Sequence, residues 1–208
     1  MVEFDVRMTS DSRCVILHDP AVDRTTDGSG KIWELDLSTV KSLDASHRHR
    51  ESFSSVGIPT LQELLDTLPP TIELNIHVYP GPDDIGSIVE ETCSQIRDRN
   101  RYNSAFISGS EEVMREVIAT DSGVRRCLLD RADDPATYLV KCGDFSCYAC
   151  QPSNTITTQS LCDEAHRLGF RVNPYYADEK SEMERLIACG VDGILTNTPE
   201  RLIELLEG

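Results

Sequence analysis

Two acidic residues stand two positions apart near the start of the chain. They are Glu3 and Asp5, in the apolar-rich stretch Val2–Met8. In a β-strand, residues two apart point to the same face of the sheet, so the two carboxylates share one face. Carboxylates held this close repel each other unless a proton or a cation lies between them, and a hard divalent metal ion is a natural partner. The alternative is an edge strand whose acids simply face water.

A histidine follows the next apolar run. His18 comes after Cys14–Leu17 and precedes Asp19 and a proline, so it lies where a short strand enters a turn. An imidazole in such a place can act as a general acid or base near neutral pH. Taken alone, a histidine here is more often an ordinary hydrogen-bonded side chain.

The stretch Ile72–Tyr79 alternates apolar and polar residues, which is the pattern of a strand. One face of this strand is polar and carries Glu73, Asn75, His77 and Tyr79. Such a strand is either exposed on that face or lines a site. A further candidate is the turn at Thr198 and Pro199, because a helix that starts there offers backbone N–H groups to an anion. Its alternative is plain helix capping.

Alternating short β-branched runs and amphipathic stretches predict the elements that position these residues. Strands are predicted at Val2–Met8, Cys14–His18, Ile72–Tyr79, Ala105–Ser108, Arg126–Leu129, Cys147–Cys150, Arg171–Tyr175 and Gly193–Thr196. Helices are predicted at Leu61–Leu68, Asp83–Asn100, Glu111–Thr120, Pro135–Lys141, Thr158–Leu168, Lys180–Cys189 and Pro199–Leu206. Because no Gly-x-Gly-x-x-Gly fingerprint of a dinucleotide fold occurs, the pattern favours an α/β fold of the TIM (β/α) barrel type over a doubly wound sheet.

The amino-acid composition excludes some classes of function. The chain has 208 residues with 36 acidic and 20 basic side chains, and its net charge is −16. This charge excludes a nucleic-acid binder, and a phosphorylated substrate would need a local cation to hold it. We expect a single domain over residues 1–208. The start of the chain has no signal-peptide pattern and no window is apolar enough to span a bilayer, so we expect a cytoplasmic protein without a transmembrane segment.

The eight cysteines are expected to be mostly reduced core residues, because a chain of this length does not need disulfides to fold. A different class of function rests on Cys147 and Cys150, which form a C-x-x-C motif of the kind found in redox-active and zinc sites. No second pair follows at zinc-ribbon spacing, and on a strand the two sulfurs would point to opposite faces.

Several motifs occur along the chain in a fixed order: Glu3–Val6, Thr9–Asp11, Val15–Asp19, Asp23–Gly30, Leu43–Ala45, Ile58–Leu64 and Gly190–Pro199. Together they resemble the glycerophosphodiester phosphodiesterase family, and the likeness runs from about Val2 to the C-terminus. The resemblance implies a TIM barrel with a small insertion, at about residues 19–57, after the His18-Asp19 pair. It also implies metal-dependent hydrolysis of small glycerophosphodiesters to sn-glycerol 3-phosphate and an alcohol, a reaction of lipid and glycerol metabolism.

The same resemblance assigns roles to residues. In the family, the residues that match Glu3 and Asp5 bind the metal, and the one that matches His18 is one of two catalytic histidines. The family's third strand carries a Glu and a Lys where this chain has His77 and Tyr79. We therefore expect His77 as a third metal ligand. The expected ion is Ca²⁺ or Mg²⁺, with Mn²⁺ as a further option.

Two tyrosines are expected to bind substrate. Tyr79 takes the place of the family's lysine, and Tyr175 lies where the family has a tryptophan. The resemblance also implies that this sequence begins at the family's second strand, as an N-terminally truncated and partly degenerate member. The strand that ends in His-Arg-Gly, with the first catalytic histidine and a phosphate-binding arginine, then has no counterpart. A barrel without that strand has open edges, which could pair in a homo-oligomer.

Two interpretations follow and stay open on sequence alone. In the first, the chain is a phosphoric diester hydrolase that is slowed by the loss of one of two catalytic histidines, since general acid–base catalysis contributes about 10²–10⁴-fold. In the second, it is a non-catalytic relative that binds a phosphorylated ligand or a protein partner.

Overall fold

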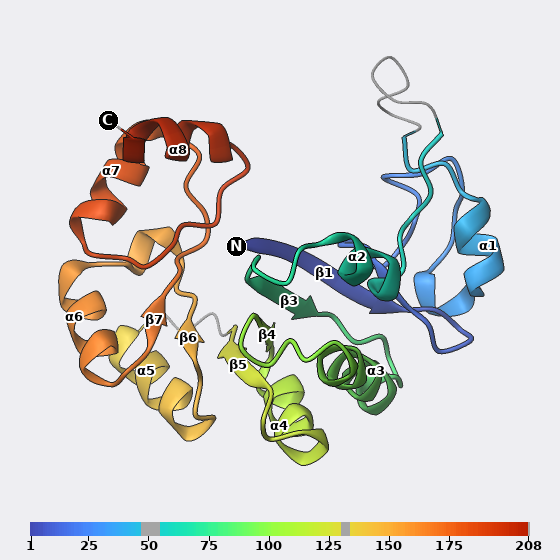
Figure 1. The fold of residues 1–208 in the computed structure, drawn as a ribbon, viewed down its shortest axis with the longest axis horizontal. Coiled ribbons are helices and arrows are strands. Elements are labelled where there is room, and N and C mark those ends of the chain that lie inside the picture. The colour runs from blue at the N-terminus through green and yellow to red at the C-terminus, as the bar shows by residue number, and fades with distance from the viewer. Residues whose placement is uncertain (47–54, 130–133, 208) are drawn as a thin grey trace. The chain divides into compact units, whose positions relative to one another are not determined.

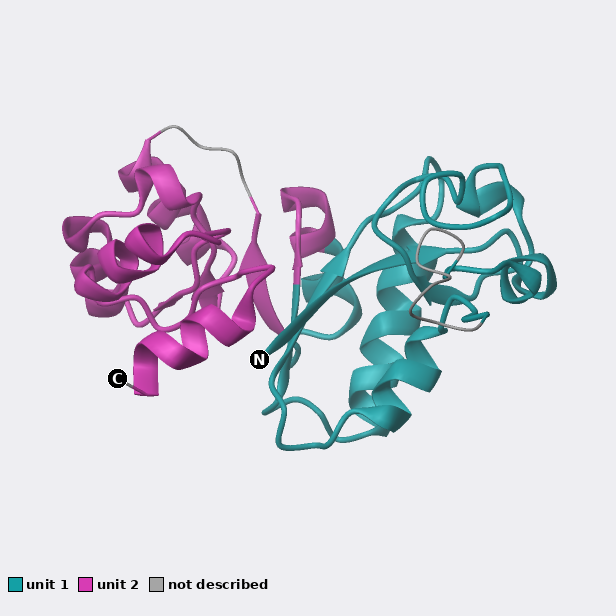
Figure 2. Cartoon of the chain, turned by 90° about the horizontal axis from the view of Figure 1, so that it is seen from above, with its two compact units in different colours: residues 1–107, 116–124 teal, residues 108–115, 125–208 magenta. Residues whose placement is uncertain are grey.

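The computed structural model describes residues 1–46, 55–129 and 134–207, and their contacts divide into two compact units. Unit 1 comprises residues 1–107 and 116–124, and unit 2 comprises residues 108–115 and 125–208 (Figure 2). Strand β4 (Ala105–Gly109) and helix α4 (Glu111–Thr120) contribute residues to both. Each unit is an α/β structure with parallel strands.

The sheet of unit 1 has β1 at its centre. Strand β1 (Val2–Met8) pairs parallel with β3 (Leu74–Val78) on one side (Figure 1). On its other side it pairs antiparallel with β2 (Cys14–Ile16). The strand order in this unit is β2-β1-β3-β4. Along β1, Phe4 and Val6 are buried in the core, as strand alternation requires.

Two helices of unit 1 carry their start signals in the sequence. Helix α2 (Leu61–Thr67) begins with a capping box, in which Thr60 and Glu63 bond to each other's backbone N–H groups. Helix α3 (Ile85–Asp98) is amphipathic and buries one face, which includes Ile88 and Ile96.

The predicted insertion at about residues 19–57 is folded in the part that the structure describes; its residues 47–54 lie outside the described ranges. It contains a 3₁₀ turn at Ile32–Glu34 and helix α1 (Leu37–Ser42), which Asp36 caps. These elements pack on their own apolar cluster, made of Val15, Leu17, Val22, Ile32, Val40 and Ile58. This cluster fixes the segment that follows His18.

Unit 2 repeats the strand-then-helix pattern. Its parallel strands, in the order β5-β6-β7, are β5 (Arg125–Leu128), β6 (Ala149–Cys150) and β7 (Arg171–Val172). Its helices are α5 (Pro135–Asp144), α6 (Gln159–Arg167), α7 (Lys180–Ala188) and α8 (Pro199–Glu207), and a 3₁₀ turn spans Asn154–Ile156. Helices α5 and α6 begin at Asp134 and Thr158, whose side chains accept bonds from backbone N–H groups of the first turn.

The predicted elements are largely confirmed, and β1 and α4 match to the residue. One predicted strand is wrong: at Gly193–Thr196 only Leu195 makes an isolated bridge, to Tyr175. The reason is local, because Asp178 accepts hydrogen bonds from the Thr196 hydroxyl at 2.9 Å and the Asn197 N–H at 2.7 Å. These bonds draw the chain into a turn just before α8.

Candidate active site

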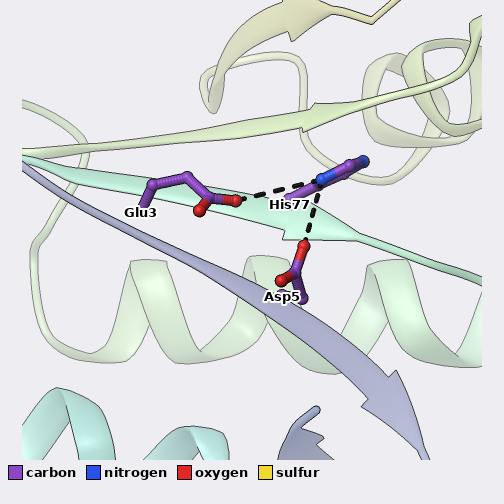
Figure 3. A group of neighbouring side chains, drawn as sticks. All are labelled: Glu3, Asp5 and His77. Atoms are coloured by element: carbon purple, nitrogen blue, oxygen red, sulfur yellow. Dashed lines mark ion pairs between the residues drawn. The ribbon is translucent and has the colours of Figure 1, made fainter. Parts of the chain in front are cut away.

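The pairing of β1 with β3 brings two carboxylates and an imidazole together. The register places Asp5 opposite His77, and Glu3 lies one alternation further along the same face of β1. The Nδ1 atom of His77 is 3.2 Å from Oδ1 of Asp5 and 3.9 Å from Oε1 of Glu3 (Figure 3). Among the described residues this is the one group of three or more potential metal-ligating side chains whose ligand atoms lie within 4.8 Å of one another.

The electrostatics of this group favour a cation. Burial raises the pKa of Glu3 from 4.5 to about 7, the Asp5 carboxylate acts in the same direction, and His18 opposes the shift. Glu3 therefore holds its negative charge at an energetic disadvantage unless a positive charge lies beside it. Two carboxylates and one imidazole form a donor set that suits a divalent ion able to accept both oxygen and nitrogen.

The raised pKa of Glu3 predicts how the stability of the metal-free protein varies with pH. Glu3 has a pKa near 4.5 in the unfolded chain and near 7 in the folded chain. At pH values between these two, the folded chain holds a proton that the unfolded chain has lost, so the free energy of unfolding falls as the pH rises. We expect the Tm in chelator to drop from pH 5 to pH 7.5, and the drop to be smaller in Glu3→Gln. Thermal unfolding at both pH values measures this, and an equal drop in both proteins contradicts it.

An aromatic stack joins the carboxylate–imidazole group to His18. The ring of Tyr79 lies on the ring of His77, with centroids 3.8 Å apart, and meets the edge of His18 at 5.8 Å. The guanidinium of Arg7 covers Tyr79, with Cζ 4.8 Å from the ring centroid, and its Nε donates to the backbone oxygen of His18 at 2.8 Å. The two predicted histidines are thus held in one contact network.

Sequence reasoning missed Arg7. The signal was present, since Arg7 follows Asp5 by two residues on the same strand and so shares its face. Arg7 is buried, so its side chain contacts other residues instead of water. Through these contacts it positions Tyr79 and the backbone of His18.

Replacing Arg7 tests that role. Arg7→Met removes a charge-assisted hydrogen bond and a cation–π contact, and is expected to destabilise the fold by about 1.5–3 kcal/mol. The matched control is Arg13→Met in the turn between β1 and β2; Arg13 is exposed, so this change is expected to alter stability by less than about 0.5 kcal/mol. Urea unfolding measures the free energy of unfolding of both variants. Equal destabilisation by the two changes would contradict the positioning role of Arg7.

His18 is oriented by its chain neighbour. Its Nδ1 lies 2.8 Å from Oδ1 of Asp19, and the same carboxylate accepts from Nη2 of Arg24 at 2.9 Å. These bonds, that of Arg24 first, hold the pKa of Asp19 well below its usual range. The imidazole is 64% exposed. With Nδ1 engaged, Nε2 is the nitrogen available for proton transfer.

Tyr175 belongs to unit 2. Its backbone N–H donates to Pro152, its carbonyl accepts from Asn154 at 2.7 Å, and its side chain is half-buried beside Tyr176. Just before α8, the Asp178 carboxylate accepts the Asn197 N–H at 2.7 Å, so this N–H is not available to an anion. All eight cysteines are free of disulfides in the structure and seven are buried, which confirms their expected place in the core.

The chain is similar to several known proteins. A sequence model of the Glycerophosphoryl diester phosphodiesterase family matches residues 1–201. A glycerophosphodiester phosphodiesterase of Caldanaerobacter subterraneus is 30% identical over 99% of this chain and 85% of the relative. Glycerophosphodiester phosphodiesterase 1 of Mus musculus is 48% identical over 62% of this chain and 40% of its own length.

Solved structures agree on the fold. An Oleispira antarctica phosphodiesterase, in complex with the product sn-glycerol-3-phosphate, matches with a TM-score of 0.88 at 20% identity, over 100% of this chain and 85% of its own. A structure from Silicibacter pomeroyi matches with a TM-score of 0.85 at 20% identity, over 99% and 82%. The predicted fold class, α/β of the TIM-barrel type, is thereby confirmed. Within the described part of the chain, no helix has the length and apolar character to cross a membrane.

Proposed function

Because this chain belongs to the glycerophosphoryl diester phosphodiesterase family, we propose that it hydrolyses small glycerophosphodiesters to sn-glycerol 3-phosphate and an alcohol, with the help of a divalent cation. The observation that carries the cation requirement is the meeting of Glu3, Asp5 and His77 at one place on the β1–β3 pair. The ion is Mg²⁺, Ca²⁺ or Mn²⁺, since oxygen donors predominate and one imidazole is tolerated.

The three side chains would hold this ion through their carboxylate oxygens and the imidazole nitrogen. When bound, it supplies positive charge to the phosphoryl oxygens of the substrate. The chain itself is strongly acidic, with a net charge of −16, so the need for such a charge is greater here than in a neutral protein.

His18 is assigned the proton transfer. Nε2 donates a proton to the departing alkoxide of the alcohol, while Asp19 holds Nδ1 and so fixes the orientation of the ring. The backbone of His18 is held by Arg7, and its ring by the edge contact with Tyr79. Fixed orientation of the acid is what converts a nearby histidine into an efficient one.

Tyr79 and Tyr175 are the proposed substrate-binding residues. Tyr79 presents a phenol within the stack that links His77 and His18, where a hydroxyl can bond to phosphate or glycerol oxygens. Tyr175 offers a half-buried phenol in unit 2.

The products identify the bond that is broken. In ³¹P NMR, glycerophosphocholine incubated with the purified chain and Mg²⁺, Ca²⁺ or Mn²⁺ is expected to give the resonance of glycerol 3-phosphate, with choline released in equal amount. Phosphocholine as the product would overturn the assignment of the scissile bond. Folded protein that binds glycerophosphocholine without any turnover would instead support the non-catalytic interpretation.

A further inference from the structure

Two thiols meet at the C-terminal end of α5. The helix ends in a Schellman motif, in which the chain reverses through a residue with positive φ; here that residue is Ser146, with φ of 49°. The two bonds of the motif are present. The Cys147 N–H donates to the Cys142 carbonyl at 2.9 Å, and the Ser146 N–H donates to the Gly143 carbonyl at 2.9 Å.

This motif brings the side chains of its first and last residues into contact, and the contact is ordinarily apolar. Helix α6 shows the ordinary case: Gly169 has φ of 86°, Phe170 donates to the Ala165 carbonyl at 2.9 Å, and both Ala165 and Phe170 are buried. At the end of α5 the two positions are Cys142 and Cys147, so the same backbone bonds place their side chains together. Their proximity is therefore imposed by the backbone.

The surroundings distinguish Cys147 from the other buried thiols. The hydrogen bond from Cys142 lowers the pKa of Cys147, and the Leu128 backbone and the Arg126 charge act in the same direction. Arg126 also ties down the turn, since its Nε donates to the Phe145 carbonyl at 3.0 Å. By contrast, burial raises the pKa of Cys150 to about 12.

Cys147 also borders an open surface pocket. A space of about 610 Å³ is lined by residues of α5 and α6 and by the turn between α5 and β6, including Gly143, Ser146 and Cys147. Cys147 itself is 7% exposed. Cys147 therefore lines this space, whereas Cys142 is fully buried.

We propose that Cys142 and Cys147 form a redox-active dithiol, which a peroxide converts reversibly into an intrachain disulfide at the end of α5. The thiolate of Cys147 attacks one oxygen of hydrogen peroxide; the O–O bond breaks, one water leaves after protonation, and Cys147 carries a sulfenic acid. The sulfur of Cys142 then attacks that of Cys147; the S–O bond breaks, a second water leaves, and the S–S bond forms. Two thiols are oxidised and one peroxide is reduced to two waters, and an added dithiol reverses the change.

The pairing differs from the one that the C-x-x-C motif suggests. Cys150 lies on β6 and is one of three cysteines that a peptide map must separate. Chymotrypsin cuts after Phe145 and Tyr148, so Cys142, Cys147 and Cys150 fall on three different peptides.

The test uses the full chain in its reduced form, treated with equimolar hydrogen peroxide, blocked with an alkylating agent and digested with chymotrypsin. A cross-linked peptide pair that contains Cys142 and Cys147, and that disappears after dithiothreitol, is the expected result. A link between Cys147 and Cys150, or full alkylation of both Cys142 and Cys147 after peroxide treatment, would overturn the proposal. This experiment needs no variant.

Variants separate the two roles. In Cys142→Ser the sulfenic acid of Cys147 has no resolving thiol, so we expect dimedone to label Cys147 at least tenfold more than in the wild type. Cys147→Ser is expected to give no cross-link at Cys142, whereas the control Cys162→Ser leaves the cross-link unchanged. Equal dimedone labelling of wild type and Cys142→Ser would contradict the assignment of Cys142 as the resolving thiol.

Discussion

Replacing His18 with alanine is expected to lower kcat for glycerophosphocholine by about 10²–10⁴-fold, the usual contribution of a general acid. The physical reason is that the departing alkoxide then leaves without a proton from Nε2. The affinity for the divalent cation is expected to stay within about threefold, because His18 is not among the three side chains that meet at the β1–β3 pair. Steady-state kinetics and a calorimetric metal titration measure the two effects separately.

The chain offers a matched control for this experiment. His166 is also partly exposed, and its Nε2 lies 2.8 Å from Asp192, as Nδ1 of His18 lies from Asp19. It belongs to unit 2 and to a helix, so His166→Ala is expected to leave kcat within about twofold. Comparable losses in the two variants would mean that His18 acts through folding and not through the reaction.

Removing a carboxylate from the candidate cation site is expected to have the other large effect. Asp5→Asn leaves the shape of the side chain but deletes the charge closest to His77. Loss even of groups that only orient metal ligands weakens binding or activity by about 10–100-fold, so we expect at least about 100-fold weaker Mn²⁺ binding and a similar loss of kcat/KM. Calorimetry and initial rates measure these quantities.

Asp98→Asn is the control for that change. Asp98 lies at the end of α3 and its side chain is 69% exposed, so it tests whether the loss of any surface acid weakens cation binding to so acidic a chain. It is expected to change Mn²⁺ affinity by less than about twofold. If both variants bind Mn²⁺ as the wild type does, Asp5 is not a ligand.

The sequence predicts those structural elements that depend on interactions between residues close together in the chain. Strand β1 and helix α4 match the prediction to the residue because their periodicity is strong and local. Helix α1 was missed because a helix from Leu37 to Ser42 is too short for periodicity; it is held by the Asp36 cap and by packing of Val40 in the apolar cluster of the insertion.

In the candidate site, too, some features follow from the local sequence and others require the structure. That Glu3 and Asp5 share a face follows from strand alternation alone. That Asp5 lies opposite His77 depends on the register between strands distant in sequence, which alternation within each strand does not determine. The contact of Arg7 with the Tyr79 ring depends on that register too, and the bond from Arg7 to the His18 backbone depends on the pairing of β1 with β2, so only the structure could reveal them.

The contact between Cys142 and Cys147 required the structure for a different reason. The motif that ends α5 usually has glycine at its positive-φ position, and here it has Ser146. Without that glycine the sequence offers no sign that the chain reverses there, and the C-x-x-C spacing directs attention to Cys150 instead.

Hydrolysis by this chain is expected to depend on a divalent cation held by Glu3, Asp5 and His77. The most direct measurement is the rate of sn-glycerol 3-phosphate release from glycerophosphocholine by wild type and Asp5→Asn, in chelator and after titration with Mg²⁺, Ca²⁺ or Mn²⁺. Chelator is expected to abolish release by the wild type, and one of these ions is expected to restore it. Asp5→Asn is expected to stay inactive at the ion concentration that restores the wild type. Release that persists in chelator, or that Asp5→Asn supports equally well, would contradict the dependence on a cation at this site.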